Sequence, residues 1–254
     1  MLQLNHVTKH FNKSTPNEVP ALDDCTLQVK DGEFVVIIGS NGSGKSTLLN
    51  LIAGTYFPDK GTIFIDEKNV TSQRDFKRSK YIARVFQDPM AGTAPDLTII
   101  DNFRLAALRT QSKTFKTGVN AAFKSKVQER LSILNLGLEN KLETMVGKLS
   151  GGQRQALTLL MSVIDHSKIL LLDEPTAALD PKSSEKIMLI ADKVIHELQL
   201  SAILVTHNMQ HAVKYGNRLI MMQQGKIIQD IFSDQKITLN VNNLYAWFDN
   251  PVMV

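Results

Sequence analysis

The sequence predicts an α/β fold in which helices cover a mostly parallel sheet and a block of helices is inserted between its two halves. Two observations predict it. Short apolar runs rich in β-branched residues alternate with helical apolar patterns towards both ends of the chain, an order typical of parallel sheets. In the middle, at about residues 88–164, helical patterns follow one another with no convincing strand between them. No internal repeat is visible, so we expect one such unit.

The first third of the chain supplies five of the nine predicted strands. Turn residues separate them: Asp31-Gly32 forms a turn, a loop at 12–20 carries Asn and Pro, and Gly54 and Pro58 end the first helix. The predicted strands are Leu2–Val7, Ala21–Val29, Phe34–Ile38, Ile63–Ile65 and Tyr81–Phe86, and the predicted helix is Ser46–Ala53.

Helices dominate the middle of the chain, and strands return after it. The helical patterns in the middle are Ile99–Leu108, Val119–Leu134 and Gln153–Ile164. Further on, the predicted strands are Ile169–Leu172, Ile203–Thr206, Leu219–Met222 and Ile227–Ile231, and the predicted helices are Ser183–Leu198 and Met209–Tyr215.

Length and composition are those of an ordinary folded protein. The 254 residues allow one or two domains, and 43% hydrophobic with 21% charged residues excludes a disordered, collagen-like or coiled-coil chain. The net charge of +4 permits an anionic partner without requiring one. The single cysteine, Cys25, excludes an intrachain disulfide, favours a reducing compartment and is expected to be a buried thiol. We expect neither a signal peptide nor a segment that spans a bilayer.

A glycine-rich loop follows the apolar run Phe34–Ile38. Its sequence, Gly39-Ser40-Asn41-Gly42-Ser43-Gly44-Lys45-Ser46, fits the phosphate-loop pattern G-x-x-x-x-G-K-[ST]. Glycines let backbone N–H groups turn towards phosphate oxygens, and the helix that follows presents its positive end to the same anion. Lys45 can reach the β- and γ-phosphates, and the hydroxyl of Ser46 can hold Mg²⁺.

An acidic pair stands at the end of another predicted buried strand. Asp173 and Glu174 directly follow Ile169–Leu172. Parallel sheets place ligand-binding residues at the carboxyl ends of their strands, so Asp173 is expected on the magnesium side of the phosphate loop. The carboxylate of Glu174 can accept a proton from an attacking water. These positions predict the hydrolysis of a nucleotide.

A second site for an anion precedes the predicted helix Gln153–Ile164. In Leu149–Gln153, Ser150 is a good N-cap, and Gly151 and Gly152 expose the first backbone N–H groups of the helix. Because one phosphate loop already holds the phosphates of one nucleotide, the second site suggests that two copies face each other and close each other's nucleotide.

In this order the motifs resemble the ATP-binding-cassette (ABC) family of ATPases over nearly the whole chain. The resemblance implies one ABC ATPase domain over residues 1–254. Its α/β P-loop core, which includes the N-terminal antiparallel strands, is expected at 1–87 and 165–254, and its helical subdomain at about 88–164. The further matching positions are the adenine-stacking aromatic Phe11, the magnesium-side Gln87, the signature Leu149–Gln153, the dimer loop Ala178-Leu179-Asp180 and the switch histidine His207.

The resemblance assigns roles to these residues. It implies catalytic roles for Lys45, Gln87, Glu174 and His207, and contact with Mg²⁺ through Ser46, Gln87 and Asp173. It implies that ATP is bound by Phe11, Gly39, Ser40, Asn41, Gly42, Ser43, Gly44, Lys45, Ser46 and Thr47 of one copy, with Ser150, Gly151, Gly152, Gln153 and Asp180 completing the site. Two departures are Phe11, where Tyr is common, and Ala177, where a Ser hydroxyl is common.

The resemblance also implies a system around the chain. ATP and Mg²⁺ are the expected cofactors, a second copy and a membrane permease on a separate chain are the expected partners, and the cytoplasmic face of the membrane is the expected place. An ATPase on a chain separate from its pore looks more like a bacterial importer, in which an extracytoplasmic substrate-binding protein is also expected. No nucleic acid is expected as a partner. Residues 87–95 resemble those of tryptophan/tyrosine uptake ATPases, so we expect uptake of an amino acid or similar small solute. The alternatives are the ATPase of a split-chain exporter or lipoprotein-release system, and a non-transport ABC ATPase.

Two basic stretches and three single residues allow further expectations. Arg74–Arg84 is predicted to be a solvated helix face. Residues 102–128 contain no acidic side chain, and we weigh contact with anionic lipid against an ordinary solvated helix. His207 and His211 have the spacing of a metal pair without a third ligand, so no metal is expected there, and Trp247 is expected to pack the last helix.

Overall fold

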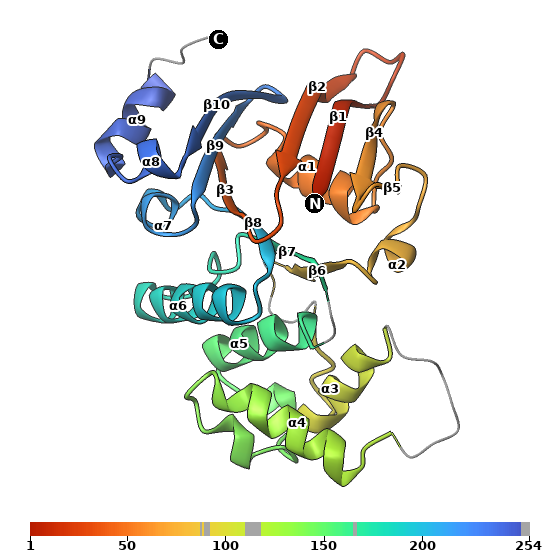
Figure 1. Cartoon of the computed structure of the whole chain (residues 1–254), viewed down its shortest axis with the longest axis vertical. Helices are drawn as coiled ribbons and strands as arrows, with labels where there is room; N and C mark the ends of the chain where they lie inside the picture. Colours follow the sequence, from red (N-terminus) through yellow and green to blue (C-terminus); the bar gives the residue numbers. More distant parts are fainter. Residues whose placement is uncertain (87, 89–91, 110–117, 165–166, 250–254) are drawn as a thin grey trace.

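The chain forms two sheets and a set of helices (Figure 1). This computed structural model describes residues 1–86, 88, 92–109, 118–164 and 167–249. The strands are β1 (Leu2–Phe11), β2 (Val19–Val29), β3 (Phe34–Gly39), β4 (Lys60–Ile65), β5 (Lys68–Asn69), β6 (Ile82–Val85), β7 (Ile169–Asp173), β8 (Ser201–Val205), β9 (Arg218–Gln223) and β10 (Lys226–Phe232). The helices are α1 (Lys45–Ala53), α2 (Asp75–Arg78), α3 (Ile99–Ala107), α4 (Ala121–Ser132), α5 (Gly151–Ser162), α6 (Pro181–Glu197), α7 (Met209–Lys214), α8 (Ser233–Lys236) and α9 (Val241–Asp249), with short 3-10 turns at Leu138–Asn140 and Val146–Lys148.

The larger sheet is parallel except at one edge. Its order is β10-β9-β3-β8-β7-β6, and only β10 runs antiparallel to its neighbour. The smaller sheet has the order β2-β1-β4-β5 and is antiparallel throughout. The predicted fold class is therefore confirmed, including the N-terminal antiparallel strands.

The parallel sheet separates two hydrophobic cores, because successive side chains of a strand point to opposite faces. Val35 and Ile37 of β3 pack with α1 and the antiparallel sheet, while Phe34, Val36 and Ile38 pack towards α5 and α6. Strands buried on both faces read as continuous apolar runs, which is why β3, β7 and β8 were predictable from sequence. Cys25 lies in the first core, where burial raises the pKa of its thiol to about 12 and leaves it inert.

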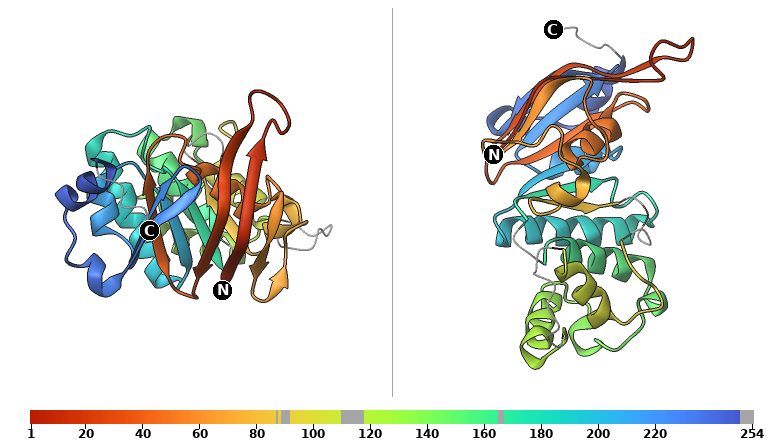
Figure 2. Two further views of the ribbon diagram at one scale, coloured as in Figure 1. Left: turned by 90° about the horizontal axis from the view of Figure 1, so that it is seen from above. Right: turned by 90° about the vertical axis from the view of Figure 1, so that its right-hand side faces the viewer.

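Helices occupy the end of the molecule opposite the antiparallel sheet (Figure 2). Phe103 of α3, Val127 and Leu131 of α4 and Leu157 of α5 are buried in the second core, which continues without a break into α6. Trp247 of α9 packs against the same core, as predicted. The division of the chain near residues 87 and 165 stays a prediction.

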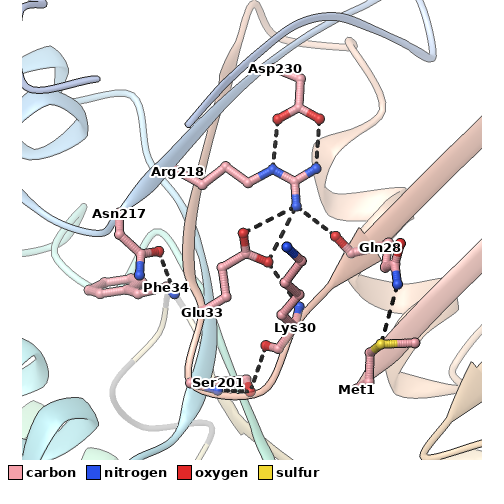
Figure 3. A network of polar contacts seen from close by, with 10 residues as sticks. Met1, Gln28, Lys30, Glu33, Phe34, Ser201, Asn217, Arg218 and Asp230 are labelled. Carbon is pink, nitrogen blue, oxygen red and sulfur yellow. Dashed lines mark hydrogen bonds and ion pairs between the residues drawn. The ribbon is translucent and has the colours of Figure 1, made fainter. Parts of the chain in front are cut away.

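One buried arginine joins the two sheets (Figure 3). Arg218 of β9 pairs through both ends of its guanidinium with Asp230 of β10, at 2.7 and 2.6 Å. Its remaining nitrogen donates to the backbone carbonyl of Gln28 in β2 and lies near Glu33, so it reaches the antiparallel sheet as well. Bidentate pairing of this kind fixes direction as well as position.

The stretch Arg74–Arg84 differs from its prediction. Its helix, α2, has four residues and is followed by β6, so no long solvated face exists there. Arg78 is fully buried, and the side chain of Arg84 is only 14% exposed. Short elements of this kind escape a periodicity argument, since one turn of helix shows no period.

Candidate functional site

The carboxyl ends of neighbouring strands bring the predicted site residues together. β3 ends at Gly39, β7 at Asp173 and β8 at Val205, and these strands lie in the order β3-β8-β7. The phosphate loop, Glu174 and His207 follow directly after these three ends. This is the edge of a parallel sheet at which ligands bind.

The phosphate loop needs glycine at its two ends for steric reasons. A Cβ at Gly39 would lie 2.3 Å from the backbone oxygen of Met222. Gly44 has a left-handed φ of +101°, and a Cβ there would lie 2.4 Å from the backbone oxygen of Ala21. Gly44 precedes α1 without a side-chain cap, and the first turn of α1 contains no acidic residue. The N–H groups at this helix end therefore face an anion site rather than a capping side chain.

Lys45 is held inside this loop. Its side chain is 5% exposed, and Nζ donates to the backbone oxygens of Gly39 and Ser40, both at 2.8 Å. Burial lowers the pKa of Lys45, while the negative charges of Glu174 and Asp173 raise it in part. The ammonium group is thus kept by nearby oxygens at the point where phosphate oxygens of a nucleotide can bind.

Glu174 and His207 form a carboxylate–imidazole pair beside the loop. The distance from Glu174 Oε1 to His207 Nε2 is 2.7 Å. Glu174 has a left-handed φ of +48°, a conformation that costs a residue with a side chain about 1–3 kcal/mol. Its backbone N–H donates to the oxygen of Val205 at 3.0 Å, and this bond to β8 holds the strained residue in place. The strained backbone places the carboxylate of Glu174 in the site beside the imidazole of His207, which can orient it.

A pocket of about 270 Å³ connects these groups. Phe11 stands at its rim, with its ring in edge-to-face contact with Tyr56 at 5.2 Å between centroids. The contact with Tyr56 fixes the Phe11 ring, and it was not foreseen from sequence because Tyr56 lies in a loop after α1. The pocket is lined by Phe11, Val19, Ala21, Asn41, Gly42, Ser43, Gly44, Lys45, Ser46, Thr47, Glu174 and His207.

The predicted signature lies elsewhere. Ser150 caps α5, its hydroxyl accepting from the N–H of Gln153 while the Gln153 side chain accepts from the N–H of Ser150. This reciprocal capping confirms Ser150 as the N-cap. Asp180 caps α6 by accepting from the N–H of Ser183 at 3.0 Å, and that bonding to Ser183 lowers the pKa of Asp180. None of residues 150–153 and 180, all of which the structure describes, lines the pocket of the phosphate loop.

Mg²⁺ fits the oxygen groups of the site. Ser46 and Glu174 line the pocket, and Asp173 stands beside Glu174 at the end of β7. Within the described residues no group of three or more His, Cys, Asp or Glu side chains could hold a metal by itself. Mg²⁺ is accordingly matched to one or two protein oxygens together with waters and substrate phosphates, the set that it prefers. His207 and His211 contact different carboxylates, those of Glu174 and Glu185.

Gln87 lies outside the described residues, and so do residues 89–91 of the segment 87–95. The backbone oxygen of Phe86, which precedes Gln87 in the sequence, accepts from Gln155 Nε2 at 3.4 Å. Gln155, which is fully buried in α5, also donates to the oxygen of Pro175 at 2.7 Å, so it ties the signature helix to the chain just after Glu174. Sequence reasoning missed Gln155 because nothing in the helical pattern distinguishes it.

Several basic side chains of the stretch 102–128 make contacts within the protein. Arg109 donates to the oxygen of Ser162 at 2.8 Å and to the hydroxyl of Ser167 at 3.1 Å. The guanidinium of Arg104 lies over the ring of Phe123, and Lys124 pairs with Glu143 at 2.9 Å. Lys113 and Lys116 lie outside the described residues. These contacts favour the solvated-helix interpretation over contact with lipid.

A glycine loop around a buried lysine, with a carboxylate and an imidazole at the ends of the next strands, defines a P-loop nucleotide hydrolase. The profile of the ABC transporter family matches residues 22–177, and the chain belongs to this family. It is an ABC ATPase, a cassette that hydrolyses ATP to power transport. No described helix has both the length and the apolar character needed to span a membrane.

Three relatives illustrate the family. The chain is 38% identical, over 99% of its length and 100% of the relative's, to a tyrosine transport ATP-binding protein of Clostridioides difficile (strain R20291). It is 30% identical, over 98% of its length and 73% of the relative's, to the methionine import ATP-binding protein MetN 1 of Oceanobacillus iheyensis. Its structure is similar to the dimeric post-hydrolysis state of an ATP-binding cassette bound to ADP and Pi, with a TM-score of 0.76, 31% identity, and coverage of 92% of this chain and 99% of that one.

Replacing Lys45 by alanine tests the phosphate loop. We expect Lys45→Ala to weaken ATP binding at least about tenfold and to reduce ATPase activity to background, because the lysine supplies the only side-chain cation lining the pocket among the described residues. Binding of a fluorescent ATP analogue and phosphate release measure the two effects. Lys186→Ala, at an exposed position of α6, is the control. ATPase activity that survives in Lys45→Ala would refute the assignment of the loop.

Proposed function

We propose that two copies of this ABC ATPase bind two ATP molecules between them and drive an importer of an amino acid or similar small solute. The observation that carries the dimer is the separation of the two anion sites in one chain. Lys45, Glu174 and His207 share a pocket, whereas Ser150, Gly151 and Gly152 at the start of α5 do not line it. A second copy that brings its α5 to this pocket completes the site, and the similar cassette solved as a dimer with ADP and Pi supports that arrangement.

We assign the hydrolytic roles by the chemistry of each group. Lys45 and the N–H groups at the start of α1 bind phosphate oxygens, and Phe11 stacks on the adenine. Ser46, Asp173 and Gln87 hold Mg²⁺, which when bound neutralises charge on the phosphates. Glu174 accepts the proton of the attacking water, and His207 orients that carboxylate and faces the γ-phosphate. Ser150, Gly151, Gly152, Gln153 and Asp180 of the other copy complete the site.

We propose that the permease binds an apolar groove beside the site. This groove, called the docking groove below, has a volume of about 540 Å³ and is lined by Asn50, Ala53, Thr55, Asp75, Phe76, Ser79, Ile82, Arg84, Phe86 and Arg109. Phe76 is 64% exposed and Phe86 39% exposed, so two large apolar side chains are open to solvent in one groove. A short amphipathic segment of a membrane protein, with an apolar anchor, matches this lining. Such binding places the chain at the cytoplasmic face of the membrane.

The names of two relatives support the proposed direction of transport and class of solute. The full-length relative is named for tyrosine transport, and a second is named for methionine import. Both names support uptake of an amino acid, in which an extracytoplasmic substrate-binding protein delivers the solute to the permease. The competing assignments are the ATPase of a split-chain exporter or lipoprotein-release system, and a non-transport ABC ATPase.

Reconstitution with the permease tests this proposal. The chain is co-expressed with the permease and binding protein encoded beside it, and the complex is placed in vesicles with ATP on the side of this chain. We expect ATP-dependent accumulation of labelled tyrosine or a related amino acid on the ATP side. Movement in the opposite direction would favour an exporter, and failure to recover any membrane protein with the chain would contradict a role in transport.

A groove variant gives the matched comparison. We expect Phe76→Glu to lower recovery of the permease about tenfold or more, because it places a carboxylate where an apolar anchor must bind. Ile237→Glu, at a position that is 84% exposed and outside the groove lining, serves as the control and should recover the permease as the unmodified chain does. Equal recovery with both variants would move the permease interface away from the groove.

A further inference from the structure

Arg84 of β6 connects to two of the three residues assigned to the metal, to Asp173 directly and to Ser46 through the amide of Asn50. Its Nη2 donates to Asp173 Oδ2 at 2.9 Å, and its Nη1 donates to Asn50 Oδ1 at 2.7 Å. The Asn50 amide in turn donates to the backbone oxygen of Ser46 at 2.8 Å. One guanidinium therefore links the end of β7 to the first turn of α1.

The pair with Asp173 lies where its electrostatic interaction is strong. The side chains of Arg84 and Asp173 are 14% and 16% exposed, so water screens their charges poorly. The guanidinium engages Oδ2 of the carboxylate, and its planar shape fixes the direction of that group. Groups that bond to a metal-binding carboxylate in this way set its orientation and its affinity for the metal.

The same arginine belongs to the docking groove. Asn50, Arg84 and Phe86 all line that groove, and the guanidinium lies 4.8 Å from the centroid of the Phe86 ring. Phe86 presents 39% of its surface to the outside, so a segment bound in the groove rests against the ring that supports Arg84. Arg84 thus lines the docking groove and also contacts Asp173.

We propose that Arg84 is a positioning residue that holds Asp173 and the start of α1 for Mg²⁺ and passes contact in the docking groove to this metal side of the site. The proposal rests on the assignment of Asp173 and Ser46 to Mg²⁺ and of the groove to the permease. Arg84 touches neither the nucleotide nor the reacting atoms in this arrangement; it acts through Asp173 and Asn50.

The test on the isolated chain is a titration with Mg²⁺. Binding of a fluorescent ATP analogue is measured in EDTA and then at rising Mg²⁺ for the unmodified chain, Arg84→Met, Arg84→Lys and the control Lys80→Met, which removes an exposed charge from the same stretch. We expect Arg84→Met to bind the analogue in EDTA like the unmodified chain but to need about tenfold more Mg²⁺ for the metal-dependent gain. Arg84→Lys keeps the charge without the fork and should fall between the two.

Two results overturn the proposal. One is a Mg²⁺ titration that is the same for Arg84→Met and Lys80→Met. The other is an equal loss of binding in EDTA and in Mg²⁺, which identifies a general packing role. Thermal unfolding of each variant without nucleotide monitors folding, and Arg84→Lys carries the test if Arg84→Met does not fold. If the unmodified chain shows no Mg²⁺ effect at all, the assignment of Asp173 and Ser46 fails, which is distinct from a failure of Arg84 alone.

The groove half of the proposal is tested in the permease complex. The Mg²⁺ requirement for analogue binding is compared between the free chain and the complex, for the unmodified chain and for Arg84→Lys. We expect permease binding to change this requirement several-fold in the unmodified chain and to change it less in Arg84→Lys, whose ammonium lacks the rigid planar fork that engages Asp173 and Asn50 from separate nitrogens. An equal change in both chains overturns the transmission through Arg84.

Discussion

Glu174→Gln is expected to bind ATP, to lose turnover by about 10²–10⁴-fold and to accumulate as a dimer when ATP is present. Glutamine has the shape of glutamate and can still hydrogen-bond the imidazole of His207, which lies 2.7 Å from the carboxylate. It cannot accept a proton from the attacking water. Binding groups are left intact while the hydrolysis that separates the two copies stops, so the closed dimer persists.

Two measurements together decide this prediction. Phosphate release gives the loss of turnover, and size-exclusion chromatography with and without ATP gives the change in mass. Glu197→Gln, a half-exposed acid at the end of α6, is the matched control and should leave both readings as in the unmodified chain. A Glu174→Gln protein that stays monomeric and still hydrolyses ATP contradicts both the catalytic role and the composite site.

The strained backbone at Glu174 shows what sequence could and could not provide. The apolar run Ile169–Leu172 predicted a buried strand, and the acid after it was predicted to point at the phosphate loop. The left-handed φ of +48° and the bond to Val205 that stabilises it depend on β8, which is thirty residues further along. Motif spacing located the residue, and only the assembled sheet defines how its carboxylate is held.

The arginines of 74–84 show the opposite case. Charge and position predicted a solvated helix face, yet Arg84 pairs with an aspartate 89 positions away and with an asparagine 34 positions away. A single sequence gives no sign of partners at such separations. The sequence alone does not distinguish a buried arginine from an exposed one. The burial of these arginines depends on α2 and β6, which are too short to show a hydrophobic period.

The strands of the parallel sheet were predictable for a physical reason that does not extend to the edges. β3, β7 and β8 are covered on both faces and are almost wholly apolar, whereas β5 has two exposed residues and pairs only with the end of β4. The helix α8 near the end of the chain was not delimited because it spans a single turn, Ser233–Lys236.

Arg78 is the buried arginine whose loss should cost the most stability. Its guanidinium donates to four backbone oxygens, those of Leu51 and Ile52 at the end of α1 and those of Thr71 and Gln73 in the loop before α2. The end of a helix carries partial negative charge, so a cation there is stabilising. Burial lowers the pKa of Arg78 to about 10, and the group stays protonated at neutral pH.

We expect Arg78→Met to lower the free energy of unfolding by about 3–5 kcal/mol, because it leaves several buried carbonyl groups without a donor. In a protein of this size such a loss lowers the melting temperature by roughly 10 °C. Arg78→Lys should lose more than half as much, since one ammonium cannot reach four oxygens in different directions. The adjacent exposed Lys77, replaced by Met, should change stability by less than about 0.5 kcal/mol. Thermal and urea unfolding of the three variants measure these differences.

Arg78 also fixes the far end of the helix that begins at Lys45, so nucleotide binding should weaken in parallel with stability. An Arg78→Met protein that melts like the unmodified chain contradicts the role of Arg78 in anchoring α1.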